Sequence, residues 1–317
     1  MGKTVTCPRP SPGSRLPFLS GQRTIPEMRL LVTGGTGFVG THLIQQALAS
    51  GHEVLSLSRR AAPSAPRLHS VAAAIESPPW DRITEFQPDV LIHTAWEATP
   101  GIYLESPDNR LWVDWSEALV EGALQRGLRR LVLLGTCIEY PITGAPLPET
   151  LTPAPVSLYA RCKDELHRRL TQRWTNPDIP LVWARLFYPY GPGEHPSRLC
   201  SSLVRRLRSG ERVTLKTPQS TKDYLHIDDV ARALLTLASQ GASGAVNIGT
   251  GTGTTVLELA QRIGRLLGRP DLVGWEDPPA PDPLHHVVAD ASRLRSLGWS
   301  PQVELEDGLR GLIRTLD

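Results

Sequence analysis

The chain has 317 residues, of which 40% are hydrophobic and 21% are charged, and its formal net charge is +2. This composition is typical of a soluble globular protein with one large core or two smaller ones, and it excludes a disordered chain. Charges of both signs are interspersed, so we expect neither a nucleic-acid-binding face nor a membrane-binding one. No run approaches the roughly eighteen apolar residues that a membrane-spanning helix needs.

The four cysteines are widely spaced and form no Cys-x-x-Cys pair: Cys7, Cys137, Cys162 and Cys200. Their spacing disfavours a disulfide framework and a zinc site, and it is typical of reduced thiols in a cytoplasmic protein. Residues 1–27 are rich in Pro, Gly, Ser and Arg and lack the apolar block of a secretory signal. We expect a flexible extension there; the alternative is that Met28 is the natural start.

Residues 28–40, MRLLVTGGTGFVG, run from an apolar segment through four glycines into a helical pattern. The pattern predicts a strand over 28–32 and a helix over 38–50 that ends at Gly51. Glycines without a Cβ let the chain turn sharply and approach a diphosphate, which the helix N-terminus then faces. The segment therefore predicts a dinucleotide-binding loop, with Gly34, Gly37, Phe38 and Val39 at the coenzyme.

From residue 28 to about residue 185 the pattern alternates strand and helix, as a doubly wound parallel sheet of the Rossmann type requires. Further strands are predicted over 53–58, 89–94, 131–136 and 181–185, and helices over 114–125 and 158–172. We expect residues 28–185 to bind the coenzyme and residues 186–317 to form mainly a smaller substrate-binding lobe, interleaved with the sheet. A ligand cleft between the two lobes follows.

The end of the second strand bears on the choice of coenzyme. An NAD site usually has an acid there for the adenosine ribose, but this strand ends in Ser58, Arg59 and Arg60. Two guanidiniums after a small hydroxyl suit a 2′-phosphate, which favours NADP over NAD. The alternative is that both arginines belong to an ordinary solvated helix start.

Tyr159 and Lys163 lie four residues apart in a predicted helix, so they share one face. A nearby ammonium favours the phenolate, and we expect it to shift the phenol pKa downward toward the range of a proton donor or acceptor. Thr136 ends an apolar strand at the edge where the coenzyme would lie and can bind a substrate oxygen. The alternative is a surface Tyr–Lys pair without function.

Because the glycine loop, the strand-end hydroxyl and the Tyr–Lys pair follow one another in this order, the chain resembles the extended short-chain dehydrogenase/reductase family. The matching branch is that of NAD(P)-dependent sugar-nucleotide epimerases, dehydratases and reductases. The matching segments are TGGTGFVG, DVLIHTAW, GTCIEYP, ARLFYPYGPGE, TKDYLHIDDVA and VNIGTGTGTTVLELA. The resemblance implies that Thr94 and Ala95 line the coenzyme, and that Thr136, Tyr159 and Lys163 are catalytic. It also implies a homodimer.

The same resemblance places Trp96, Tyr188, Arg198 and Lys222 on the sugar-nucleotide side of the cleft. Tyr188 stands where the family commonly has Asn, and Lys222 where it has Arg. Cys137 and Ile138 follow Thr136 where the family's dehydratases have Asp and Glu, which disfavours 4,6-dehydration. We expect Cys137 to be buried and inert. His195 is interpreted either as an acid for epimerisation or as an ordinary loop residue.

We therefore expect NADPH-dependent reduction of a nucleotide-linked keto-sugar, in particular an NDP-4-keto-6-deoxyhexose. The alternative within the same chemistry is a nucleotide-sugar epimerase, which uses the same residues and consumes no NADPH. A third hypothesis is a non-catalytic NADP-binding sensor, against which the combination of a proton donor, a strand-end hydroxyl and a lysine argues.

Overall fold

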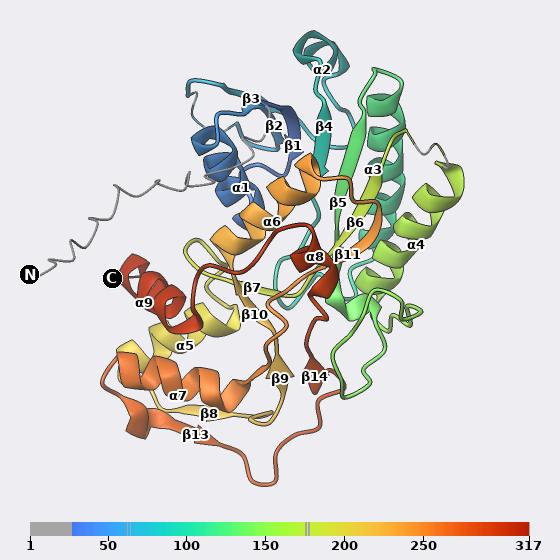
Figure 1. The fold of residues 1–317 in the computed structure, drawn as a ribbon. Helices are drawn as coiled ribbons and strands as arrows, with labels where there is room; N and C mark the ends of the chain where they lie inside the picture. The colour runs from blue at the N-terminus through green and yellow to red at the C-terminus, as the bar shows by residue number, and fades with distance from the viewer. Residues whose placement is uncertain (1–26, 62, 64, 175, 177, 317) are drawn as a thin grey trace, which may run out of the picture.

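The computed structural model describes residues 27–61, 63, 65–174, 176 and 178–316. The predicted flexible extension, apart from its last residue, lies outside these residues. A parallel seven-stranded sheet occupies the upper part of the molecule (Figure 1). Its strand order is β11-β6-β5-β4-β1-β2-β3, and each neighbouring pair is parallel. The predicted Rossmann-type sheet is confirmed.

The strands of this sheet are β1 (Arg29–Thr33), β2 (Glu53–Ser58), β3 (Leu68–Ala72), β4 (Val90–His93), β5 (Arg130–Thr136), β6 (Leu181–Leu186) and β11 (Gly244–Ile248). Because all of them run the same way, their carboxyl ends meet at one edge of the sheet. The residues that end β1, β2, β4 and β5 therefore lie near one another, although they are far apart in the sequence.

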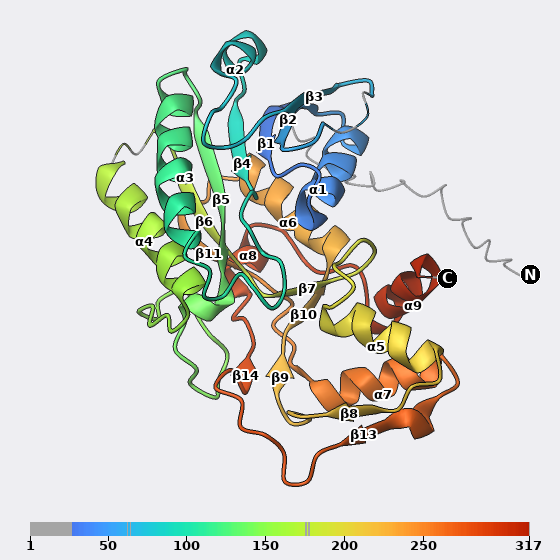
Figure 2. The same cartoon turned by 180° about the vertical axis from the view of Figure 1, so that it is seen from behind.

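Helices cover both faces of the sheet, α1 (Phe38–Ala49) and α6 (Ile227–Ser239) on one side, α3 (Asn109–Leu124) and α4 (Leu158–Arg173) on the other (Figures 1 and 2). Side chains alternate along a strand, so Leu30 and Val32 of β1 join the core under α1 and α6, while Leu31 joins the core under α3 and α4. The short helix α2 (Trp80–Phe86) packs on the second of these cores.

The lower lobe has its own hydrophobic core, built largely from three helices (Figure 1). These helices are α5 (Leu199–Arg208), α7 (Val256–Leu266) and α9 (Leu305–Thr315). The remaining elements are β7 (Tyr188–Tyr190), β8 (Val213–Leu215), β9 (Thr221–Lys222), β10 (Tyr224–His226), β12 (Thr254–Thr255), β13 (Val273–Trp275), β14 (His286–Val287), α8 (Ser292–Ser296), and the 3-10 turns η1 (Cys137–Glu139) and η2 (Pro270–Leu272). Two elements beyond residue 185, α6 and β11, pack with the sheet.

Among the α-helices and strands up to residue 185, the predicted and observed elements differ by more than one residue in three places. The helix predicted over 114–125 begins at Asn109, because that buried side chain bonds the carbonyls of Tyr103 and Ser106 and so anchors an extra turn. Neither β3 nor α2 was predicted. Strand β3 is a partly exposed edge strand with a weak apolar pattern, and α2 spans just 7 residues.

Candidate active site

The glycine loop links the end of β1 to the start of α1. Gly34 has a φ of +74°, and its N–H donates a hydrogen bond to the Leu57 carbonyl at the end of β2. A Cβ on Gly40 would lie 2.2 Å from the Gly34 carbonyl oxygen, so the helix can approach the loop this closely because Gly40 has none. No side chain caps the start of α1, which leaves its backbone amides available to an anion.

A cavity of about 900 Å³ opens beside this loop, at the carboxyl edge of the sheet. It brings together nearly all the predicted site residues from both lobes. They are Gly34, Gly37, Phe38, Val39, Ser58, Arg59, Arg60, Thr94, Ala95, Trp96, Thr136, Tyr159, Lys163, Tyr188 and Arg198. The glycine cradle, the uncapped helix and the volume of the cavity fit a dinucleotide coenzyme.

Lys222 is the predicted site residue that does not line this cavity. Its Nζ donates a hydrogen bond to Asp282 Oδ2 at 2.9 Å and another to the Leu284 carbonyl. The side chain is buried, and the ion pair holds its charge inside the lower lobe. The structure thus corrects the expectation that Lys222 faces a bound substrate.

The part of the cavity beside the end of β2 carries the predicted cationic group. Ser58 Oγ accepts a hydrogen bond from the Thr36 N–H at 3.1 Å, which fixes the end of β2 against the glycine loop. The Arg59 side chain is 79% exposed, and its Nη2 lies 3.8 Å from Glu97 Oε2. Because the Arg59 guanidinium is so exposed, it can reorient toward an anionic ligand.

Thr136, Tyr159 and Lys163 all line the cavity. Thr136 ends β5, while Tyr159 and Lys163 lie in the first turns of α4, which Ser157 begins by accepting the Ala160 N–H. The Tyr159 N–H also donates to the Leu104 carbonyl, so the loop before α3 is tied to this helix end. The predicted grouping of a phenol, a hydroxyl and an ammonium is therefore present.

Aromatic rings surround the phenol. The Tyr103 ring packs edge-on against the Tyr159 ring, with centroids 4.9 Å apart. The Trp96 ring also packs edge-on against the Tyr159 ring, with centroids 6.2 Å apart. Tyr103 also lines the cavity and was not singled out from the sequence. It lies in a loop between β4 and α3, and its contact with Tyr159 depends on how that loop folds.

Burial sets the protonation of the Tyr159 phenol and the Lys163 amine. It raises the pKa of the Tyr159 phenol well above its ordinary value, and the expected downward shift by Lys163 is wrong for the free protein. The Lys163 Nζ lies 5.9 Å from the centre of the Tyr159 ring. Burial also lowers the pKa of Lys163 to about 7, so its ammonium is readily deprotonated near neutral pH.

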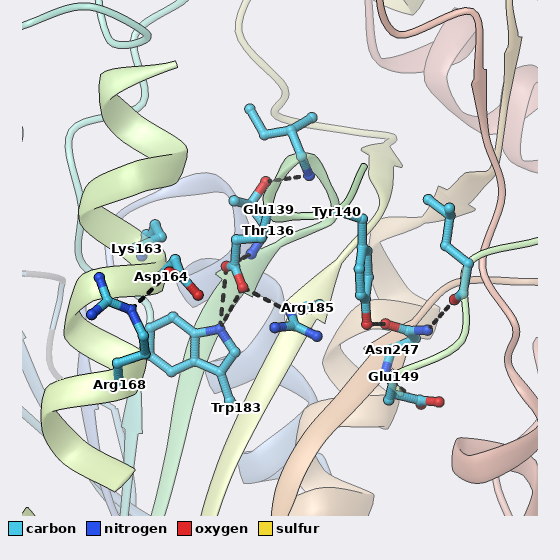
Figure 3. A network of polar contacts seen from close by, with 12 residues as sticks. Thr136, Glu139, Tyr140, Glu149, Lys163, Asp164, Arg168, Trp183, Arg185 and Asn247 are labelled. Atoms are coloured by element: carbon cyan, nitrogen blue, oxygen red, sulfur yellow. Dashed lines mark hydrogen bonds and ion pairs between the residues drawn. The ribbon is translucent and has the colours of Figure 1, made fainter. Parts of the chain in front are cut away.

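A buried carboxylate behind Thr136 was missed in the sequence. Glu139 is fully buried, and Oε1 accepts the Thr136 N–H at 2.8 Å (Figure 3). Its oxygens also accept hydrogen bonds from Trp183 Nε1 at 3.0 Å and Arg185 Nε at 2.8 Å, both on β6. The Thr-x-x-Glu spacing of a capping box is the local signal that could have found it.

Two further expectations concern single residues. Cys137 is buried, and burial raises the pKa of its thiol to about 12, which agrees with an inert thiol. His195 does not line the cavity; its Nδ1 lies 2.7 Å from Ser197 Oγ in an exposed turn, which agrees with an ordinary loop residue. Within the described residues no group of His, Cys, Asp or Glu could hold a metal ion, and none of the described helices is long and apolar enough to cross a membrane.

Comparisons with known proteins agree with this geometry. A family model described as the NAD dependent epimerase/dehydratase family matches residues 30–249. The UDP-glucose 4-epimerase of Mycolicibacterium smegmatis is 29% identical, over 89% of this chain and 96% of that protein. UDP-glucuronic acid decarboxylase 6 of Arabidopsis thaliana is 27% identical, over 97% of this chain and 93% of that protein.

Solved structures give the same result. The UDP-glucose 4-epimerase of Thermotoga maritima with UDP-glucose superposes with a TM-score of 0.80 and 25% identity, covering 91% of this chain and 98% of that one. The UDP-glucose 4-epimerase of Thermus thermophilus in complex with NAD has a TM-score of 0.77 and 28% identity, covering 91% of this chain and 98% of that one.

Proposed function

The chain belongs to the NAD-dependent epimerase/dehydratase family, and from that premise we propose that it is a nucleotide-sugar epimerase. The observation that carries the proposal is the meeting of Thr136, Tyr159 and Lys163 in one cavity with the glycine loop. The similar UDP-glucose 4-epimerases favour epimerisation over the reduction of a keto-sugar, which was the first expectation from the sequence.

The residues of this site suit reversible oxidation of a carbinol. A bound nicotinamide coenzyme supplies hydride exchange with the sugar carbon. In its deprotonated form Tyr159 accepts the carbinol proton as the C–O bond becomes a carbonyl, and as the phenol it returns that proton when the carbinol re-forms with the opposite configuration. Thr136 orients the reacting oxygen by a hydrogen bond, and Lys163 binds the coenzyme ribose beside the phenol. The hydride and the proton both return to the sugar, so the cycle consumes no coenzyme.

For the coenzyme we infer NADP. The end of β2 offers Ser58, Arg59 and Arg60 and no carboxylate, and all three side chains line the cavity. A 2′-phosphate would attract both guanidiniums, whereas an unphosphorylated ribose carries no charge for them to bind. The solved relative from Thermus thermophilus contains NAD, so binding of the two coenzymes must be compared directly.

The substrate class is a nucleoside diphosphate hexose. Arg198 is the cation on the substrate side of the cavity, with its guanidinium 5.9 Å from the centre of the Tyr103 ring, and among the described residues it forms no ion pair. With Lys222 bound to Asp282, Arg198 carries the recognition of the diphosphate. Trp96 and Tyr188 provide flat apolar walls for the sugar and the base.

The test incubates the protein with UDP-glucose, UDP-N-acetylglucosamine or UDP-glucuronic acid and a catalytic amount of coenzyme. Proton NMR of the sugar ring follows the product. We expect a mixture of C4 epimers from at least one substrate, with no net change in absorbance at 340 nm. Stoichiometric oxidation of NADPH with a nucleotide keto-sugar, without epimers, would replace this proposal by the reductase.

A further inference from the structure

We propose that Glu139 is a positioning residue of this site, because its buried carboxylate fixes the main chain of Thr136 and, paired with Arg185, places a negative charge behind the catalytic side chains. The proposal rests on the proposed function in one respect: Thr136, Tyr159 and Lys163 are taken as the reacting set. Glu139 itself does not line the cavity and touches no substrate.

The first argument is geometric. Thr136 is both the last residue of β5 and the N-cap of η1, and Glu139 closes that turn by accepting the Thr136 N–H at 2.8 Å. The Thr136 hydroxyl faces the same turn, where it accepts the Ile138 N–H at 3.5 Å. The direction of the hydroxyl therefore depends on a peptide that the carboxylate holds.

The carboxylate is itself immobilised. Trp183 Nε1 and Arg185 Nε bind it at 3.0 and 2.8 Å, and both come from β6, the strand next to β5 (Figure 3). Gly135 makes room for this contact, since a Cβ there would lie 2.3 Å from Trp183 Nε1 and 2.9 Å from Glu139 Oε1. A shift of Glu139 would require the sheet to move as well.

The second argument is electrostatic. Glu139 and Arg185 are almost fully excluded from water, so their charges are weakly screened. The negative charge of Glu139 raises the pKa of both Lys163 and Tyr159, against the lowering of the Lys163 pKa by burial. The charged and titratable groups that interact with the carboxylate are Tyr159 and Lys163 of α4, Arg185 of β6, and Cys137 and Tyr140 of its own turn.

Charge and geometry can be separated by two substitutions. Glu139→Gln keeps a carbonyl oxygen for the Thr136 N–H but removes the negative charge. Glu139→Asp keeps the charge and shortens the side chain by one methylene, so the bond to Thr136 is lost. Asp229→Asn is the matched control, because Asp229 is a fully buried carboxylate that binds the N–H groups of Gln302 and Val303 away from the cavity.

The charge is tested in the free protein, without substrate. The chain has four lysines, so labelling the lysine ε-carbon with ¹³C gives a spectrum of four side-chain signals, and Lys163→Met identifies the one of interest. We expect Glu139→Gln to lower the pKa of Lys163 by about one unit, and Glu139→Asp and Asp229→Asn to leave it unchanged. An unchanged pKa of Lys163 in folded Glu139→Gln would overturn the proposal.

The geometry is tested with the epimerase assay. Glu139→Asp should lower kcat about tenfold with little change in KM, because substrate binding does not involve the Thr136 peptide. The pH profile of kcat should keep its wild-type position in this variant and shift to lower pH in Glu139→Gln. Wild-type kcat in Glu139→Asp would overturn the proposal even if Glu139→Gln does not fold. Should no sugar be turned over by the wild type, the proposed function fails while the lysine titration still decides the electrostatic role.

Discussion

The Lys163 Nζ lies 3.9 Å from the centre of the Trp96 ring and donates a hydrogen bond to the Leu134 carbonyl at 2.8 Å. The indole is fixed in turn, since its Nε1 donates to Asn109 at 2.8 Å and its face stacks on Trp112. An aromatic face partly replaces the water that the ammonium has lost. Trp96 therefore stabilises the charged form of Lys163 in addition to lining the cavity.

We expect Trp96→Leu to lower the pKa of Lys163 below the value of about 7, because the side chain stays apolar but loses its π face. The pKa of Lys163 is measured from its NMR titration. Trp112→Leu is the control, as Trp112 stacks on Trp96 without covering the ammonium. A rise in the Lys163 pKa in Trp96→Leu would show that the indole acts mainly by excluding water.

Tyr159→Phe should reduce epimerisation by about 10²–10⁴-fold, because it removes the proton acceptor and leaves the ring packed against Tyr103. Coenzyme affinity, measured by fluorescence quenching, should stay within about twofold. Tyr190→Phe provides the control: this buried tyrosine donates to the Leu305 carbonyl in the lower lobe, so its loss should affect thermal stability and spare kcat. Unchanged turnover in Tyr159→Phe contradicts the mechanism.

Replacing Arg59 and Arg60 together by Gln should weaken NADPH binding at least tenfold and NADH binding by less than about threefold, since the 2′-phosphate is the group that meets the guanidiniums. Dissociation constants for both coenzymes, measured at the same low ionic strength, provide the comparison. Equal weakening of both coenzymes would mean that the arginines attract the diphosphate instead, and the NADP preference would be wrong.

Gly40→Ala should disrupt the coenzyme loop, because the new methyl group would lie 2.2 Å from the Gly34 carbonyl oxygen and α1 would have to move away. We expect loss of coenzyme binding and a lower melting temperature. Gly311→Ala in α9 is the matched control: nothing lies within 4 Å of its new methyl group, so it should raise stability by about 0.5–1 kcal/mol. Normal coenzyme binding in Gly40→Ala would argue against the close approach of helix and loop.

The sequence predicted the parts of this site that local patterns determine. The glycine loop and the four-residue spacing of Tyr159 and Lys163 each depend on one strand–helix unit. Glu139 depends on Trp183 and Arg185, which follow more than forty residues later, and its pairing requires knowing that β5 and β6 are neighbours.

The position of Lys222 outside the cavity could not be predicted for the same reason. Its partner Asp282 lies 60 residues away, on the far side of β11 and α7 in the chain. Sequence spacing could place a lysine near the expected diphosphate but not the carboxylate that binds it. The direction of the Tyr159 pKa shift was also wrong, because burial by Tyr103 and Trp96 comes from a loop whose path no periodicity reveals.

Strand β11 enters the sheet after α5 of the lower lobe and before α7 and α9, and it pairs with β6 along five residues. A chimera that joined the first 185 residues to the substrate lobe of another enzyme would leave the β6 edge without hydrogen-bond partners unless the donor brought its own matching strand. Exchange of whole lobes is thus a poor route to new sugar specificity in this protein, and libraries confined to the cavity wall are the better one.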